Sequence, residues 1–120
     1  MNSKMRARIK KIDAYCDKHL FYGLTNLNDG FDITSIKYFS EKDFEVVLER
    51  VKTLGFGIYG IDTFRFIEDK RYYSCDVFEI HTSNPADATR YMTCFEKNKK
   101  RGDNIVYAAS YFIPKKLYLK

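Results

Sequence analysis

Apolar residues recur at intervals of three and four positions in three stretches of the chain, which is the period of one face of a helix. The first stretch, residues 4–20, places five apolar residues on one side: Met5, Ile9, Ile12, Cys16 and Leu20. Ser3 is suited to cap the start of this stretch, and Gly23 is suited to the exit. We therefore expect a helix over residues 4–20.

The second stretch, residues 41–54, carries the strongest helix signals. Ser40 is a good N-cap with Asp43 three residues further on, and Phe39 and Phe44 are placed to pack together across the cap. Gly55 stands where many helices end in a left-handed residue. This stretch predicts a helix with one continuous apolar face.

The third stretch predicts a helix that Asn84 caps, with Pro85 at its first position and Asp87 in its first turn. Four residues form its apolar face: Ala88, Tyr91, Met92 and Phe95. The cations of residues 97–101 complement the helix dipole at the far end, and Gly102 ends the helix.

Runs rich in Ile, Val, Phe and Tyr predict the strands. Residues 56–67 and 72–82 flank the polar turn 68–71 and should form a hairpin in which Tyr59 faces Ile80. In this register the apolar side changes face partway along. That change predicts either a bulge near Gly60 or Asp62, or a hairpin tip that packs away from the main core. Residues 105–113 are apolar on both faces and fit the centre of a sheet, and a short strand is expected within 31–39.

The order of these elements predicts an α+β fold with two layers, a mostly antiparallel sheet and helices packed on one of its faces. A chain of 120 residues can bury one core, so we expect a single globular domain over residues 1–120. No apolar run is long enough for a transmembrane helix, and the N-terminus lacks the apolar segment of a secretory signal.

The stretch GFGIYG, residues 55–60, matches the G-x-G-x-x-G spacing of a dinucleotide-binding loop. Such a loop follows a strand and opens a helix, whereas here a predicted helix comes first and a predicted strand follows. We interpret Gly55 as a helix cap, Gly57 as a site of close packing and Gly60 as a bend or bulge. We therefore expect no nucleotide cofactor.

Three cysteines at wide spacing (Cys16, Cys75 and Cys94) form no C-x-x-C pair, and only two histidines accompany them. This pattern indicates neither a zinc site nor a disulfide framework. We expect buried thiols in a reducing cytoplasm, and no metal or other cofactor.

The net charge of +5 is distributed unevenly along the chain. Residues 1–11 carry five cations and no acid, and residues 97–120 carry seven cations and one acid. Residues 12–96 hold nine Lys/Arg and fifteen Asp/Glu, a formal charge of −6. Basic ends therefore flank an acidic middle, and both kinds of segment indicate charged partners.

The predicted hairpin combines acidic and aromatic residues, which favours binding to a basic protein. The candidate partner-binding residues are Asp62, Phe64, Phe66, Glu68, Asp69, Tyr72, Tyr73, Asp76 and Glu79. An ordinary charged sheet face with inward-packed aromatics is the alternative interpretation.

The sequence allows two other functions. The basic N-terminal helix, with Lys4, Arg6, Arg8, Lys10 and Lys11, could contact nucleic-acid phosphates. An acid–base site could be assembled from Asp62, Glu79 and His81, although their spacing matches no catalytic motif. We expect the protein not to be an enzyme.

Residues 40–61, SEKDFEVVLERVKTLGFGIYGI, resemble the helix-then-strand unit of small bacterial immunity proteins. These proteins accompany the toxins of contact-dependent growth inhibition and related polymorphic toxin systems. The resemblance implies a cytoplasmic inhibitor that binds a cognate toxin domain, often a nuclease, and covers its active site. It implies no membrane association, and nucleic-acid binding through the basic N-terminal helix remains the alternative.

Overall fold

The computed structural model describes residues 2–30, 32, 35–66, 72–74, 81–98 and 105–118 of the 120-residue chain. In chain order the elements are α1 (Ser3–His19), β1 (Phe39–Ser40), α2 (Glu41–Leu54), β2 (Gly57–Phe66), β3 (Tyr72–Ser74), β4 (His81–Ala86), α3 (Ala88–Asn98), β5 (Ile105–Phe112) and α4 (Lys115–Tyr118).

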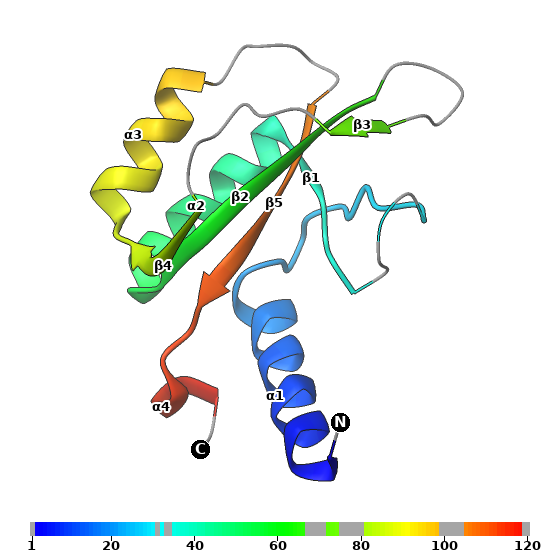
Figure 1. Ribbon diagram of the computed structural model, residues 1–120, viewed down its shortest axis with the longest axis vertical. Helices are drawn as coiled ribbons and strands as arrows, with labels where there is room; N and C mark the ends of the chain where they lie inside the picture. The colour runs from blue at the N-terminus through cyan, green and yellow to red at the C-terminus, as the bar shows by residue number, and fades with distance from the viewer. Residues whose placement is uncertain are drawn as a thin grey trace.

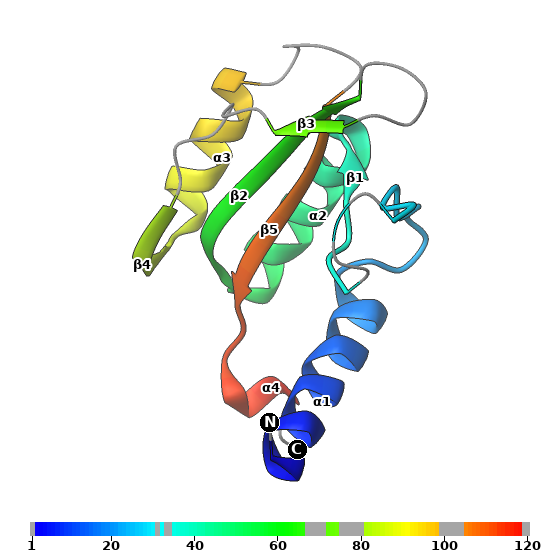
Figure 2. The same cartoon turned by 45° about the vertical axis from the view of Figure 1, so that its right-hand side comes forward.

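One antiparallel sheet organises the molecule, with the strand order β1-β5-β2-β3 and with β4 also paired to β2. Helices α2 and α3 cover one face of this sheet, and α1 and α4 lie together at one end (Figures 1 and 2). The predicted α+β fold, with two layers and an antiparallel sheet, is therefore confirmed.

Helix α2 forms as its local sequence predicts. The Ser40 hydroxyl accepts a hydrogen bond of 3.2 Å from the backbone N–H of Asp43. Gly55 ends the helix with a φ of 77°, and its N–H donates to the carbonyl of Lys52. Phe39 and Phe44, the pair expected to pack across the cap, are both buried in the main core.

Helix α1 begins one residue earlier than predicted, because Asn2 caps it in place of Ser3. The Asn2 side-chain oxygen accepts a hydrogen bond of 2.8 Å from the backbone N–H of Met5. The expected apolar face is buried only in its second half. Leu20 is fully buried, whereas Met5 is 53% exposed and Ile9 is 42% exposed.

The prediction that Asn84 caps the third helix is wrong. Asn84 and Pro85 belong to strand β4, whose Ala86 pairs with Ile58 of β2. This pairing keeps the segment extended, so α3 begins at Ala88. The cap is Asp87, whose carboxylate accepts a hydrogen bond of 3.1 Å from the N–H of Arg90.

The hairpin forms with a different register from the predicted one. Phe66 pairs with Tyr72, and Gly60 pairs with His81, so neither β3 nor β4 pairs with β2 in the predicted register. The five residues between Phe66 and Tyr72 are one more than the predicted turn of four, which shifts the pairing of β3 with β2 by one residue. The bulge predicted near Gly60 is present between Ile58 and Gly60, in the pairing of β2 with both β4 and β5.

The bulge divides β2 between two apolar clusters. Ile58 and Ile61 both face the main core, to which α1, α2, α3 and β5 also contribute buried side chains. Beyond the bulge, Phe64 faces the opposite side of the sheet. There it packs with Tyr38, Val106 and other residues of a smaller second cluster. The bulge that the sequence pattern allowed is therefore present, and Phe64 beyond it packs away from the main core.

The segment before β1 covers this second cluster and is turn-rich, as expected. Asn26 and Asn28 organise it through their side chains. The N–H of Tyr38 donates to the Asn26 side-chain oxygen at 3.0 Å, and the Asn28 amide donates to the carbonyl of Ile36 at 2.8 Å. The strand expected within 31–39 reduces, in the described part, to β1 at Phe39–Ser40.

Strand β5 pairs with both β1 and β2, which confirms its expected interior position. Residues 105–108 are buried on both faces, and residues 109–112 then alternate between half-buried and exposed. The last residues of β5 therefore emerge from the covered part of the sheet. Pro114 follows the strand, and α4 then turns back beside α1.

Candidate functional site

The candidate residues of the hairpin have different environments. Asp62 is exposed to solvent. Phe64 is half-buried, and its ring packs edge-on against Tyr38 with 5.5 Å between the ring centroids. Phe64 is therefore only partly accessible, because Tyr38, in the segment before β1, packs against it.

The other hairpin candidates lie partly or wholly outside the described part of the chain. The backbone of β3 sets Phe66 opposite Tyr72, and Arg65 opposite Tyr73. The side chains of Phe66, Tyr72 and Tyr73 lie outside the described part of the chain. Glu68, Asp69, Asp76 and Glu79 lie outside it entirely.

Next to Asp62, on the face opposite α2 and α3, part of the sheet is more exposed than the part that the segment before β1 covers. Gly60 pairs with Ser110 and Gly57 pairs with Phe112, so Ser110 and Phe112 stand beside the bulge. Ser110 is exposed, and Phe112 is 42% exposed. The half-buried Tyr59 packs edge-on against Phe112 with their ring centroids 6.1 Å apart. We call Tyr59, Asp62, Ser110 and Phe112 the open sheet half.

A tyrosine and two carboxylates meet at the border of the open sheet half. The Tyr38 hydroxyl donates a hydrogen bond of 2.6 Å to the Asp32 carboxylate. Burial, this hydrogen bond and the charges of Asp32 and Asp62 all raise the pKa of Tyr38. A raised pKa keeps the phenol protonated, so Tyr38 is not activated as a base or nucleophile.

The catalytic alternative gains no support from the described residues. Glu79 lies outside them, and of His81 only the backbone pairing with Gly60 is described. No group of three or more His, Cys, Asp or Glu side chains within the described ranges is close enough to hold a metal ion. Burial, with Asp13 and Asp17 nearby, raises the pKa of the Cys16 thiol to about 12, so this cysteine is a poor nucleophile.

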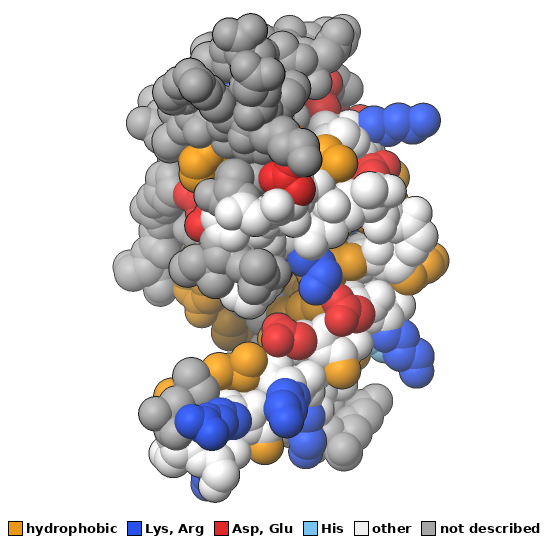
Figure 3. Space-filling model, turned by 90° about the vertical axis from the view of Figure 1, so that its right-hand side faces the viewer, with side chains coloured by type: hydrophobic (Ala, Val, Ile, Leu, Met, Phe, Trp, Pro, Cys, Tyr) orange, Lys and Arg blue, Asp and Glu red, His pale blue; other side chains and the backbone are white. Residues whose placement is uncertain are grey.

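The basic residues of α1 are all exposed, as the alternative nucleic-acid site requires: Lys4, Arg6, Arg8, Lys10 and Lys11. Figure 3 shows Lys and Arg side chains gathered at the lower end of the molecule, with acidic side chains higher on the same face. The only ion pair among the described residues joins Lys37 to Asp17 at 2.9 Å. The five cations therefore have no described carboxylate within ion-pair distance.

Three hollows follow one another along α1 and α4. Lys4, Arg8 and Lys11 line the first, of about 230 Å³. The second, of about 500 Å³, is lined by Lys11, Tyr15, Lys18, Tyr118 and others, and a third of about 620 Å³ extends from Tyr118 and Ile12 to Lys115, Lys116 and Phe112. Lys11 lines the first two and Tyr118 the last two, so successive hollows are neighbours that share a lining residue. We call the line formed by these three hollows the α1–α4 groove.

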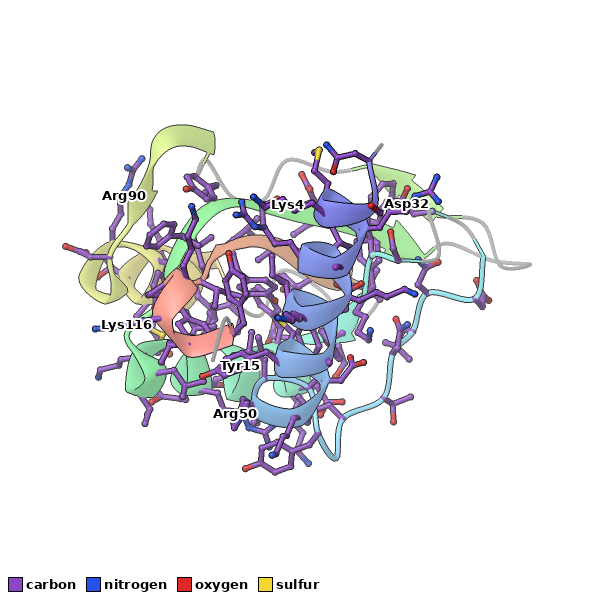
Figure 4. The ribbon with its side chains drawn as sticks, turned by 90° about the horizontal axis from the view of Figure 1, so that it is seen from below. Lys4, Tyr15, Asp32, Arg50, Arg90 and Lys116 are labelled. Atoms are coloured by element: carbon purple, nitrogen blue, oxygen red, sulfur yellow. The ribbon has the colours of Figure 1, made fainter. Side chains whose placement is uncertain are left out.

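Helix α4 supplies residues that the sequence did not indicate. Figure 4, viewed from below, shows α4 beside α1, with Tyr15 on the side of α1 toward α4 and Lys116 on α4 itself. The four residues of α4 follow Pro114 and carry no helix pattern of their own. Only tertiary contact with α1 brings Lys115, Lys116 and Tyr118 to this groove.

A further groove, of about 580 Å³, lies between the end of α1 and the outer face of α2. Arg50 of α2 forms one wall. Its guanidinium donates hydrogen bonds to the carbonyls of Leu20 at 3.0 Å and Tyr22 at 2.8 Å, and stacks over the Tyr22 ring at 3.7 Å. Arg50 thus holds the segment after α1 onto α2, which gives it a structural role.

No protein-family model matches the chain, and no curated protein or solved structure matches it either. No helix in the described part of the chain is both long and apolar enough to cross a membrane.

Proposed function

We propose that the protein is an inhibitor that binds a cognate toxin domain, of the nuclease class, and covers its active site by stoichiometric association in the bacterial cytoplasm. The open sheet half is the observation that carries this proposal. An exposed aromatic residue, Phe112, stands there beside Tyr59 on the face opposite α2 and α3, at the edge of the hollow that α1 and α4 border. Aromatic residues of this kind act as anchors in protein interfaces.

The charge around this surface supports a basic partner. Asp62 is exposed at the border of the open sheet half, and β2 continues from it into the hairpin with its further acidic residues. An acidic field attracts a basic nuclease domain and raises the association rate. A stable interface covers roughly 800 Å² on each partner, more than four residues supply. We therefore include the acidic hairpin in the proposed contact surface.

The test is inhibition of the cognate toxin domain, which the proposal predicts to be encoded beside this chain's gene. The purified chain should abolish the activity of that domain at a one-to-one ratio. Phe112→Ala and Asp62→Lys should each weaken the complex by at least about thirtyfold, the effect of losing an interface hot spot. Val46→Ala is the matched control, because Val46 is 37% exposed on α2, away from this surface.

The inhibitor proposal would be abandoned if the toxin domain kept full activity in the presence of excess chain. Equal weakening by Phe112→Ala and Val46→Ala would remove the open sheet half as the contact surface. Inhibition that requires far less than one chain per toxin would indicate an enzymatic mechanism instead.

A further inference from the structure

The first half of α1 extends beyond the main core. Residues 3–11 are all exposed, and Met5 and Ile9, which continue the apolar face, have no described partner in the core. The helix contains Lys4, Arg6, Arg8, Lys10, Lys11 and Lys18, with only Asp13 and Asp17 as acids. This half of α1 adds little to the core and presents a high density of positive charge.

The local electrostatics favour a bound anion. A helix N-terminus carries about half a positive charge from its backbone dipoles, which acidic residues usually offset. The first turn of α1 contains no acid, and cations follow at once. Each of these charges raises the free energy of the others, and a polyanion in the groove would reduce that repulsion.

The α1–α4 groove places these cations in a line with aromatic rings. Lys4, Arg8, Lys11 and Lys18 lie along one side of α1, and a helical rise of about 1.5 Å per residue gives this row a length of about 21 Å. Tyr15 and Tyr118, both half-buried, line the middle of the groove. Lys115 and Lys116 continue the positive charge on α4.

This combination is the one that single-stranded nucleic acid requires. Cations along a groove follow a phosphate backbone, and aromatic rings stack on successive unpaired bases. A duplex keeps its bases stacked on one another and could use only the cations. An acidic protein would likewise engage the charges but gain nothing specific from the face of Tyr118.

We propose that the α1–α4 groove binds single-stranded nucleic acid, with phosphates on its lysines and arginine and an unpaired base against Tyr118. This activity is separate from toxin inhibition. The groove and the open sheet half meet only at Phe112 and Tyr59, which both border the last hollow. Variants in α1 or α4 therefore test one proposal without altering the central residues of the other.

The experiment measures fluorescence anisotropy of labelled oligo(dT) and oligo(U) of about 12 nucleotides, a length within the usual range of such sites. The full chain should bind both strands and bind a duplex of equal length more weakly. Affinity should fall as salt rises from about 50 to 200 mM, with a slope near −0.7 for each phosphate neutralised.

Two variants separate charge from stacking. Lys115→Gln combined with Lys116→Gln should make the salt slope shallower by about 1.4, the contribution of two phosphate contacts. Tyr118→Leu keeps an apolar side chain in place of the ring, and it should weaken binding at least about fivefold with the salt slope unchanged. Far-UV circular dichroism confirms that each variant is folded.

The matched control is Lys42→Gln combined with Lys52→Gln, which removes the same charge from exposed positions of α2. The control should bind within about twofold of the parent chain. Equal loss in the control and the Lys115/Lys116 variant would overturn the proposal in favour of nonspecific attraction. Equal affinity for the duplex and the single strand would also overturn the proposal. So would an affinity for poly-glutamate that equals the affinity for the single strand and falls in the same variants, because that result would identify an acidic protein as the partner.

Discussion

Two tyrosines of β5 allow the same substitution to be tested with opposite expected signs. Tyr111 has a buried hydroxyl with no hydrogen-bond partner among the described residues. Tyr107, on the same face of the strand, donates a hydrogen bond of 3.0 Å to the Glu41 carboxylate. Tyr111→Phe removes an unsatisfied polar group, whereas Tyr107→Phe removes a satisfied one.

The expected magnitudes follow from these environments. Burying a hydroxyl without a partner costs about 1–3 kcal/mol, so Tyr111→Phe should raise the free energy of unfolding by about 1 kcal/mol. A hydrogen bond to a charged acceptor contributes about 1.5–3 kcal/mol, and this one is only part-buried, so Tyr107→Phe should lower it by about 1.5 kcal/mol. The ring packing is unchanged in both variants.

Urea unfolding followed by circular dichroism measures both changes. With a dependence on urea of about 1–3 kcal/mol per molar, the two midpoints should move in opposite directions, by about 0.3–1 M for Tyr111→Phe and about 0.5–1.5 M for Tyr107→Phe. The reasoning would be refuted if Tyr111→Phe lowered the midpoint, because the hydroxyl would then have a partner that stabilises the fold. It would equally fail if Tyr107→Phe left the midpoint unchanged.

Three further predictions concern stability. Arg50→Ala should lower the free energy of unfolding by about 2–4 kcal/mol, since it removes two charged hydrogen bonds and a ring contact. The control Lys52→Ala, on the exposed side of α2, should change it by less than about 0.5 kcal/mol. Both changes are measured from urea midpoints, and equal effects would contradict the structural role of Arg50. Gly55→Ala should cost about 1 kcal/mol through its φ of 77° alone, because nothing lies within 4 Å of the added methyl group, and thermal unfolding that shows no loss would contradict this. Folding raises the pKa of Cys16 from 9.0 and of Tyr91 from 10.0, each to about 12. The free energy of unfolding should therefore be at its full value below pH 9 and fall as pH rises toward 12, by up to about 1.4 kcal/mol per pH unit for each group. Tyr91→Phe should reduce this slope in unfolding curves at several alkaline pH values, and an unchanged slope would contradict the assignment of the effect to Tyr91.

The elements that the sequence predicted well are those whose signals are local. Helix α2 has its cap, apolar face and terminal glycine within residues 39–55. In the structure the cap begins the helix, the apolar face is buried and the glycine ends the helix. The GFGIYG stretch is similar: Gly55 ends the helix, β2 begins at Gly57, and the bulge lies between Ile58 and Gly60. Each assignment depends on backbone geometry that neighbouring residues determine.

The elements that were predicted wrongly depend on distant partners. Asn84 and Pro85 carry good helix-start signals, but pairing of β4 with β2 keeps them extended. The hairpin register depended on a loop length that the residues between the strands do not fix. The partial burial of Phe64 could not be predicted, because nothing in its own segment shows that Tyr38 packs against it.

The candidate sites show the same limit. The exposure of Asp62 and of the α1 cations follows from charge and could be predicted. The open sheet half could not, because it depends on which part of the sheet the segment before β1 leaves uncovered. Tyr118 is a further example, since it reaches the α1–α4 groove only through the packing of α4 on α1.

The most direct test of the proposed function is isothermal titration of the full chain with the cognate toxin domain, which the proposal predicts to be encoded beside its gene. We predict a one-to-one complex with a Kd of about 1 nM or below, weakened at least about thirtyfold by Phe112→Ala and unchanged by Val46→Ala. Absence of binding, or a complex that Phe112→Ala leaves intact, would contradict the proposal that this protein inhibits a toxin through the open sheet half.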